Sequence, residues 1–346
     1  MKYKVLEDEK VKIIRSPIYN YNFDKSTGYF ERWGKDKEND PMFSPFGPEI
    51  LDIEITTICN GIGNYGPCPF CYKANTNKGT YMSFDAFKKI FDKLPNTTNQ
   101  IAFGVDAKCK SNPDTFKIME YTRENGVIPN VTVADVDKET AKKLAGVCGA
   151  VAVSRYQDKE ICYDTIQRLA DAGLDQINIH QMISLETLYQ AYRTIDDYCF
   201  DDRVRENIKA IVFLSLKTKG RGKGYIPLSQ EEFDDLVNYA MDKNVPIGFD
   251  SCSAPKLMNT IKDNPNKKEI EQSIEPCEST LFSLYCDVNG EFYPCSFCEQ
   301  IDRWDNGISG IDINDFISDV WNNKRLMNFG KKLVVENKRS CPIYNI

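Results

Sequence analysis

The chain has 346 residues, of which 41% are hydrophobic and 27% charged, a composition typical of a folded globular protein and unlike that of disordered or collagen-like chains. No apolar run approaches the ~18 residues that a membrane-spanning helix needs, and the N-terminus lacks the apolar core of a secretory signal, so we expect a cytoplasmic protein without membrane segments. The formal net charge of −7 gives no electrostatic reason to expect a nucleic-acid partner.

The cysteine and histidine counts narrow the possible chemistry. The chain has 13 cysteines and one histidine, His180. Without a secretory signal, so many cysteines favour metal, iron–sulfur or redox chemistry over a set of disulfides. A single histidine excludes zinc sites and mononuclear iron sites that need several histidines.

Residues 1–46 have a mixed composition and predict only an N-terminal extension. From residue 47, strand-like apolar segments alternate with segments of helical periodicity. The expected strands are 49–56, 100–105, 127–133, 150–154, 176–180, 210–216 and 245–249. The expected helices begin after Ser83, at about residues 114, 138, 159 and 185, and at the capping box of Ser229 and Glu232. This alternation predicts an α/β fold, namely a complete or partial parallel TIM-like barrel.

The alternation stops near residue 256, where we place a domain boundary. The following polar, lysine-rich residues 256–275 are typical of a connector. The elements expected beyond it are strands 281–286 and 291–295 around the hairpin signal Asn289-Gly290, and a helix at about 313–329. We therefore expect a barrel unit at 47–255 and a small α+β unit at 256–346.

Polar residues alternate with apolar ones in two expected strands. In 176–180, Ile177 and Ile179 share one face, while Asn178 and His180 share the other. Thr132 alternates with valines in the same way. Barrel strands are normally apolar on both faces, so these residues indicate either a lined, hydrated site or a few satisfied polar core residues.

Three cysteines lie in the loop that follows the first expected strand. Cys59 precedes the segment Cys68-Pro69-Phe70-Cys71, and glycines at 61, 63 and 66 lie between them. Three thiolates on a glycine-rich loop suit three corners of a four-iron cluster whose fourth iron stays open to another ligand. The loop leaves the carboxyl end of its strand, where barrel enzymes place their chemistry. The alternative is three buried cysteines without a common function.

This loop resembles that of the radical S-adenosylmethionine (SAM) enzymes, which carry C-x3-C-x-aromatic-C on a partial (β/α)6 barrel. Phe70 takes the aromatic position, and Tyr72 follows the last cysteine. The spacing departs from the motif, because eight residues separate Cys59 from Cys68. The resemblance implies a [4Fe-4S] cluster on Cys59, Cys68 and Cys71 that binds SAM.

The resemblance also implies SAM contacts further along the barrel. Gly104 and Asp106 stand where the family has a Gly-Gly-Glu-Pro segment that holds the amino group of SAM. Ser154 and Arg155 resemble the family's ribose and carboxylate contacts, and the planar fork of an arginine suits a carboxylate. A surface ion pair is the alternative role for Arg155.

The C-terminal part resembles the family's auxiliary-cluster domains, called SPASM or Twitch. Cys277, twelve residues, Gly290, four residues and Cys295 match their signature. The resemblance implies a second iron–sulfur cluster, of the [4Fe-4S] type, on Cys277, Cys295, Cys298 and Cys341. Cys298, Cys286 and Cys252 compete for the remaining ligand position. A structural zinc site is the alternative, because zinc also accepts four thiolates.

Such a family member uses SAM to make a 5′-deoxyadenosyl radical that abstracts hydrogen from a substrate, and takes its electron from a donor such as flavodoxin or ferredoxin. The resemblance favours a peptide or protein side chain as substrate, and a small molecule or nucleoside is the alternative. A zinc-stabilised barrel without radical chemistry is the alternative from another class. Asp250, Cys252 and His180 are candidate catalytic residues, with structural roles as their alternatives. The basic segment 217–223 predicts either an anion clamp or a solvated loop.

Overall fold

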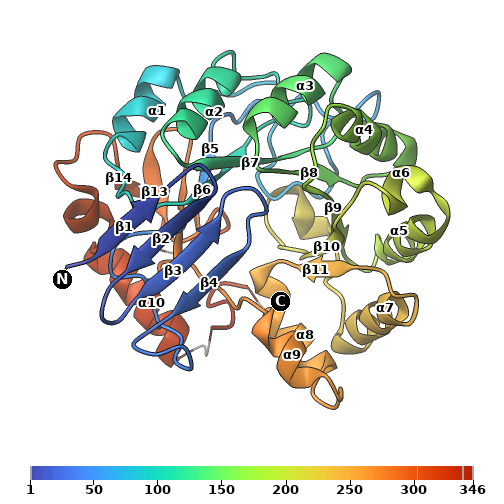
Figure 1. Ribbon diagram of the computed structural model, residues 1–346. Helices are drawn as coiled ribbons and strands as arrows, with labels where there is room; N and C mark the ends of the chain where they lie inside the picture. Colours follow the sequence, from blue (N-terminus) through green and yellow to red (C-terminus); the bar gives the residue numbers. More distant parts are fainter. Residues whose placement is uncertain (1, 302, 337–338, 345–346) are drawn as a thin grey trace.

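The structure is a computed structural model that describes residues 2–301, 303–336 and 339–344 (Figure 1). Its described residues form a ten-stranded mixed sheet and a separate four-stranded antiparallel sheet. The ten-stranded sheet has the order β11-β10-β9-β8-β7-β6-β5-β12-β13-β14. No pairing joins β11 to β14 in the described part of the chain, so the barrel is open on that side.

Parallel strands form the main part of the large sheet, and each lies beside its neighbour in sequence. They are β5 (Ile50–Glu54), β6 (Gln100–Gly104), β7 (Ile128–Val133), β8 (Ala150–Ser154), β9 (Ile177–Ile183), β10 (Ala210–Ser215) and β11 (Ile247–Phe249). Their apolar outward residues, such as Leu51, Ile179 and Phe213, are fully buried. The mixed α/β fold with a large parallel sheet, predicted from the alternation of strands and helices, is confirmed.

Helices cover the outside of this sheet (Figure 1). They are α1 (Phe84–Phe91), α2 (Thr115–Glu124), α3 (Lys138–Val147), α4 (Lys159–Asp171), α5 (Leu188–Phe200), α6 (Asp202–Arg205) and α7 (Gln230–Asp242). Polar N-caps start several of them, and the predicted capping box of Ser229 and Glu232 opens α7. Among the described helices, none combines the length and the apolar character required to cross a bilayer.

The C-terminal part extends the same sheet. Its strands are β12 (Ser283–Cys286), β13 (Glu291–Tyr293) and β14 (Ile308–Ser309), and β12 pairs in parallel with β5. The predicted hairpin is present between β12 and β13, with Gly290 at φ +82°. One sheet therefore runs through both predicted units, and the boundary near residue 256 stays a prediction.

Two C-terminal predictions need correction. The segment expected as a connector holds two short helices, α8 (Ala254–Thr260) and α9 (Lys267–Gln272). The single helix expected at 313–329 is a π-helix at Ile317–Trp321 followed by α10 (Lys324–Val335). Asn323 caps α10 with its side chain, which explains where the second helix begins. Two 3₁₀ turns, Gly220–Gly224 and Ser251–Ser253, complete the described elements.

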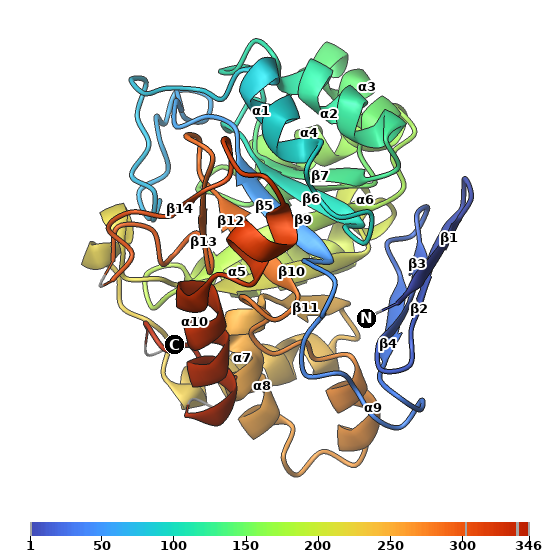
Figure 2. The same ribbon diagram turned by 90° about the vertical axis from the view of Figure 1, so that its left-hand side faces the viewer.

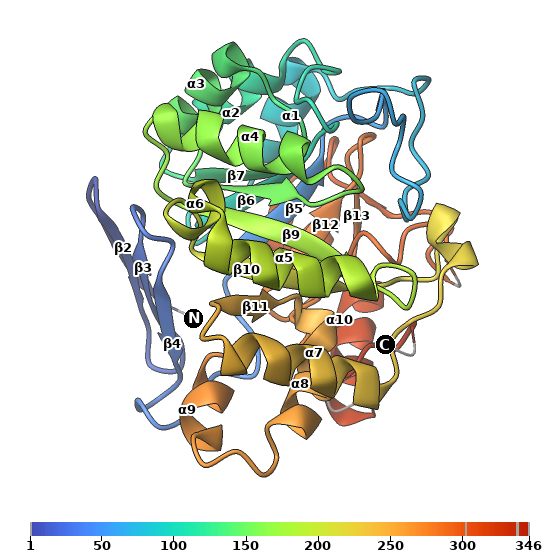
Figure 3. The same cartoon turned by 90° about the vertical axis from the view of Figure 1, so that its right-hand side faces the viewer.

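Where the sequence predicts only an extension, the structure has an antiparallel sheet. Its strands are β1 (Lys4–Glu7), β2 (Val11–Arg15), β3 (Asn20–Asp24) and β4 (Phe30–Trp33). This sheet closes the amino-terminal end of the barrel, because Lys12 donates to the carbonyl of Thr98 at 2.8 Å and Arg32 pairs with Glu49 at 2.8 Å. Figures 2 and 3 show it at one end of the parallel strands, with the cysteine loop at the opposite end.

Candidate functional site

A cavity of about 800 Å³ lies inside the open barrel, a volume within the range of cofactor and substrate pockets. Residues of β5 to β10, of the cysteine loop and of the C-terminal part line it together. The cavity brings together most of the predicted site residues, namely Cys59, Cys68, Phe70, Cys71, Tyr72, Gly104, Ser154, Arg155, His180, Asp250, Cys252, Cys277, Cys295, Cys298 and Cys341.

Backbone pairing explains how the long spacing between Cys59 and Cys68 is accommodated. The residues between them form a tight turn in which the N–H of Ile62 donates to the carbonyl of Gly66 at 3.0 Å. Gly61 has φ +83°, and a Cβ there would lie 1.9 Å from the carbonyl carbon of Gly66. Only glycine fits this close approach, so the inserted residues turn back within the loop.

The backbone N–H of Cys71 donates to the carbonyl of Cys68 at 3.3 Å. The neighbouring Cys68 thiol lowers the pKa of the Cys71 thiol against the opposing effect of burial. The basic segment predicted after β10 wraps this pair. Arg221 donates through Nε to the carbonyl of Cys68 at 2.9 Å and through Nη1 to that of Asn75 at 3.1 Å. Its own backbone N–H donates to the carbonyl of Cys71 at 3.0 Å. The segment is thus a strap on the cysteine loop, and neither the expected anion clamp nor a solvated loop describes Arg221.

Aromatic side chains surround the same loop. The ring of Phe70 stacks on that of Tyr156, with centroids 5.5 Å apart, and meets Tyr225 edge-on at 5.9 Å. The hydroxyl of Tyr72 donates to Ser296 Oγ at 3.1 Å, and its ring lies 4.5 Å from that of Phe297. Phe70 therefore covers one side of the cavity, while Tyr72 joins the cysteine loop to the C-terminal part.

Two of the predicted SAM contacts differ in their placement. Gly104 lines the cavity at the end of β6. Asp106 is buried away from the cavity lining, and its carboxylate accepts backbone N–H bonds from Lys108, Lys110 and Ser111 at 2.8–3.1 Å. Asp106 thus shapes its own loop, and its carboxylate is not presented to a ligand in the cavity, contrary to the sequence-based expectation.

Ser154 and Arg155 lie at the end of β8 and line the cavity. Arg155 is buried, and its Nη1 donates to the carbonyl of Tyr156. Its buried Nε has no hydrogen-bond partner among the described residues. A buried guanidinium donor without a partner is costly, so this atom fits an acceptor supplied by a bound group. The surface ion pair considered for Arg155 is not present in the described residues.

The C-terminal cysteines gather at the other side of the cavity. Cys295 Sγ and Cys298 Sγ are 3.5 Å apart, and this contact lowers the pKa of the Cys295 thiol. Arg339 donates to the carbonyl of Cys277 at 3.2 Å and so brings the tail with Cys341 beside them. Cys286 does not line the cavity, because it is fully buried beside the carbonyl of Asp287.

Asp250, Cys252 and Lys217 form a charged group at the ends of β10 and β11. Asp250 forms an ion pair with the buried Lys217. Burial favours the neutral amine, but the charge of Asp250 outweighs it and raises the pKa of Lys217. Burial raises the pKa of the Cys252 thiol, so its proton is held firmly. Lys217 Nζ also lies 4.8 Å from the ring centroid of Phe297. Asp250 is therefore neutralised by this lysine.

Polar side chains line the barrel interior as the alternation in β7 and β9 predicts. Thr132, Asn178 and His180 face the cavity, whereas Ile177 and Ile179 are fully buried on the opposite face. Thr132 Oγ1 lies 3.3 Å from His180 Nδ1. Burial lowers the pKa of His180 to about 4, so the imidazole is neutral at pH 7.

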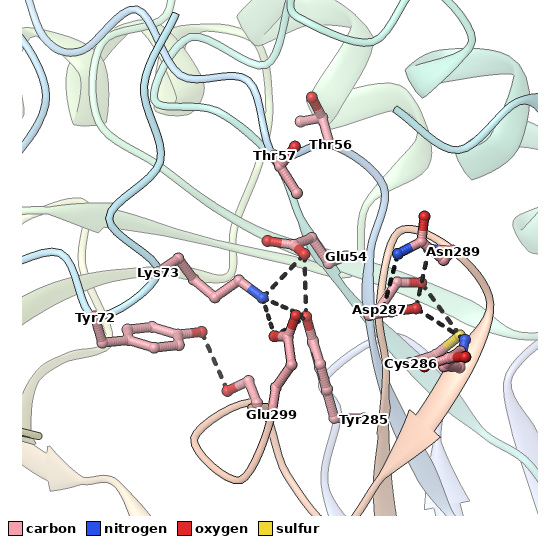
Figure 4. A network of polar contacts seen from close by, with 12 residues as sticks. Glu54, Thr56, Thr57, Tyr72, Lys73, Tyr285, Cys286, Asp287, Asn289 and Glu299 are labelled. Atoms are coloured by element: carbon pink, nitrogen blue, oxygen red, sulfur yellow. Dashed lines mark hydrogen bonds and ion pairs between the residues drawn. The ribbon is translucent and has the colours of Figure 1, made fainter. Parts of the chain in front are cut away.

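Figure 4 shows a polar network around Lys73 that the sequence analysis did not predict. Lys73 forms ion pairs with Glu54 at 3.1 Å and with Glu299, and donates to the hydroxyl of Tyr285 at 2.9 Å. Burial favours the neutral amine, but the two carboxylates outweigh it and raise the pKa of Lys73. In the sequence, only the position of Lys73, two residues after Cys71, could have indicated that this lysine belongs to the site.

The cysteines on the cavity wall fall into two groups, one in the loop after β5 and one in the C-terminal part. In residues 2–301, 303–336 and 339–344, no group of three or more His, Cys, Asp or Glu side chains is placed to hold a single metal ion. Cysteine thiolates bind both single zinc ions and iron–sulfur clusters. The two cysteine groups that share the cavity wall, and the partnerless Nε of Arg155, are compatible with an iron–sulfur cluster beside a bound acceptor.

Comparison with known proteins gives distant similarities only. No family model matches the sequence, and no curated protein matches it. The maturase HydG of FeFe-hydrogenase from Carboxydothermus hydrogenoformans has 12% identity and a TM-score of 0.45 over 82% of this chain and 67% of its own. Coproporphyrinogen III oxidase HemN from Escherichia coli, described as a radical SAM enzyme, has 16% identity and a TM-score of 0.39 over 57% of this chain and 52% of its own.

An HpcH/HpaI aldolase from Desulfitobacterium hafniense is also similar, with 11% identity and a TM-score of 0.33 over 70% of this chain and 87% of its own. The three proteins differ in activity, and all three TM-scores lie below 0.5. These similarities therefore do not indicate the activity of this protein. Its activity has to be inferred from the geometry of the cavity.

Proposed function

We propose that this protein is a radical SAM enzyme. The observation that carries the proposal is the common cavity that Cys59, Cys68 and Cys71 line at the carboxyl ends of the barrel strands. Together with the spacing of Cys68, Phe70 and Cys71, this arrangement supports a four-iron cluster held by three thiolates with one iron free for SAM.

Four residues around the cavity have a defined role in this proposal. When bound, the cluster and SAM supply an electron and a 5′-deoxyadenosyl radical that abstracts a hydrogen atom from the substrate. Arg155 would donate its free Nε to the carboxylate of SAM, and Phe70 with Tyr156 would cover the cluster and limit the access of water. Arg221 holds the cysteine loop in place through the carbonyls of Cys68 and Asn75.

We also propose a second cluster, held by Cys277, Cys295, Cys298 and Cys341. Residues 256–346 would then form a Twitch-like domain. All four cysteines line the cavity, and the contact between Cys295 and Cys298 supports them as neighbouring ligands. Cys252 also lines the cavity and is a candidate either to ligate this cluster or to return a hydrogen atom to a substrate radical. A zinc site on the same thiolates is the alternative that metal analysis separates.

We propose a peptide or protein side chain as the substrate, and a small molecule or nucleoside as the alternative. Asp250 and His180 lie on the cavity wall where a substrate would approach the radical. Flavodoxin or ferredoxin would supply the electron. Deuterium transfer from labelled candidate peptides or nucleosides into 5′-deoxyadenosine would distinguish the two substrate classes, because only the true substrate donates its label.

Iron analysis tests the cluster assignment directly. The protein is reconstituted anaerobically, and iron, sulfide and zinc are measured with electron paramagnetic resonance spectra of the reduced form. We expect two iron–sulfur signals in the wild type, loss of one in Cys68→Ala/Cys71→Ala, and loss of the other in Cys277→Ala/Cys295→Ala. Cys286→Ala, a cysteine outside the cavity, is the matched control and should keep both signals. Stoichiometric zinc without iron would contradict the proposal.

A further inference from the structure

One acidic side chain inside the barrel has no partner. Asp52 on β5 lines the cavity, and its neighbours Leu51 and Ile53 are fully buried. Its side chain is solvent-accessible, and its carboxylate forms no hydrogen bond or ion pair with the described residues. Burial in the barrel raises the pKa of Asp52 to about 6, which still leaves most of the carboxyl ionised at pH 7.

The other charged groups on the cavity wall are already matched within the described chain. Lys73 pairs with Glu54, Lys217 pairs with Asp250, and Glu278 pairs with Arg32 from β4 at 3.2 Å. The guanidinium groups of Arg155 and Arg221 donate to backbone carbonyls. Asp52 is therefore the charged side chain on the described cavity wall that is open to the cavity and has no partner from the chain, so its carboxylate is available to a positive group from outside.

Hydrogen-bonding capacity on β9, across three strands from Asp52, is also unused. Within the described residues, the amide of Asn178 has no hydrogen-bond partner, and His180 bonds only through Nδ1. Small side chains at Ala102, Ala150 and Ala152 leave space between these polar groups, and all three line the cavity. Asp52 thus belongs to a polar surface with room for a ligand.

Asp52 and Asn178 lie deeper in the barrel than the expected SAM contacts Gly104 and Ser154, while His180 is level with Ser154. In the strand register Asp52 faces Ala102, while Gly104 at the end of β6 is two positions further toward the cysteine loop. Two strand residues correspond to about 7 Å. The deeper position suits the substrate, because the strand ends are occupied by the residues proposed for the cluster and SAM.

We propose that Asp52 binds a cationic nitrogen group of the substrate, an ammonium or guanidinium, and that Asn178 and His180 hydrogen-bond to other polar atoms of the same substrate. This inference rests on the proposed function for calling the ligand a substrate. The carboxylate accepts charge-assisted hydrogen bonds from the cation, and the neutral imidazole and amide avoid repelling it. An apolar or anionic substrate would leave the carboxylate unmatched.

Calorimetric titration of the anaerobically reconstituted full chain tests this inference with defined probes. Pentylamine and pentylguanidine carry the cation, while pentanol and pentanoate share their chain without it. We expect the cations to bind and Asp52→Asn to weaken their binding by at least about tenfold. Asp85→Asn, the same change at an exposed position on α1, is the matched control and should leave binding unchanged.

Three results would overturn the inference. They are equal affinity of Asp52→Asn and wild type for the cations, equal binding of pentanol and pentylamine, and no cation binding up to about 10 mM. Asp52→Asn keeps the shape of the side chain and breaks no ion pair of the described chain, so it should fold as well as the wild type, which thermal unfolding checks. Failure of the proposed function would instead appear as absent iron or absent 5′-deoxyadenosine, so the two failures are separate.

A second pair of probes identifies the source of the cation. Acetyl-Gly-Lys-Gly-amide carries the ammonium group on a peptide, and its norleucine counterpart has a similar side chain without the charge. Tighter binding of the lysine peptide than of pentylamine assigns the subsite to a peptide side chain. Tighter binding of pentylamine assigns it to a free amine. Either result supports a cation subsite at Asp52, provided that Asp52→Asn abolishes the preference for the charged probe.

Discussion

Lys73 and Glu299 form an ion pair that joins the loop of Cys68 and Cys71 to the loop of Cys298. Lys73 follows Cys71 by two positions, and Glu299 follows Cys298 directly. Glu54 at the end of β5 shares the same ammonium group. One buried lysine therefore fixes both cysteine loops against the barrel.

Replacing this lysine should destabilise the protein strongly. Lys73→Met leaves Glu54 and Glu299 buried without a counter-charge, and we expect a loss of about 3–5 kcal/mol in the free energy of unfolding. Glu299→Gln leaves the pair of Lys73 and Glu54 intact and should cost less. Urea unfolding of both variants measures the difference, and equal losses would contradict the shared role of Lys73.

The strap formed by Arg221 should control how firmly the cysteine loop holds iron. Arg221→Gln removes the donors to the carbonyls of Cys68 and Asn75, so the loop loses two anchors. We expect iron to be lost to a chelator about tenfold more readily than from the wild type. Lys223→Gln, at an exposed position of the same segment, serves as control. If both variants retained iron like the wild type, the strap would have no role in metal retention.

The turn between Cys59 and Cys68 should not tolerate a side chain at Gly61. In Gly61→Ala the new Cβ would collide with the backbone of Gly66, and we expect lower iron incorporation and a loss of about 1–3 kcal/mol in unfolding free energy. Gly66→Ala is the matched control, because Gly66 also has a positive φ but no atom within 4 Å of the new Cβ. Iron content and urea unfolding are measured for both variants. Identical values for the two would contradict the close approach of Gly61 to the backbone of Gly66.

Much of the barrel and of its polar interior is predictable from local sequence patterns. The alternation of strands and helices identifies β5 to β11, since each element carries its own periodicity. The facing of Asn178 and His180 opposite Ile177 and Ile179 follows from the two-residue period of a strand and is confirmed.

Features that depend on distant partners could not be predicted in this way. The ion pair of Lys73 and Glu299 joins residues 226 positions apart. In β2 the charged Lys12 faces inward to the carbonyl of Thr98 and interrupts the apolar pattern that would have indicated a strand. Asp106 was expected to face a ligand, but the folded loop directs three N–H groups to it.

The stability of the protein should fall on acidification through His180. Its pKa is about 4 in the folded protein and 6.5 when exposed, so the unfolded chain gains the proton first as the pH decreases. The contribution of the neutral His180 to the free energy of unfolding is complete above pH 6.5 and is lost as the pH falls toward 4. The loss is about 2 kcal/mol at pH 5. His180→Asn should show a smaller decrease in unfolding free energy between pH 7 and pH 5. An unchanged decrease would show that His180 is not the group responsible.

The central claim is that Cys59, Cys68 and Cys71 hold a cluster that cleaves SAM. The most direct test is the chromatographic measurement of 5′-deoxyadenosine after anaerobic incubation of the reconstituted protein with SAM and dithionite. The account predicts 5′-deoxyadenosine from the wild type and none above background from Cys68→Ala/Cys71→Ala. Production of 5′-deoxyadenosine by that variant at the wild-type rate, or none by the iron-loaded wild type, would contradict it.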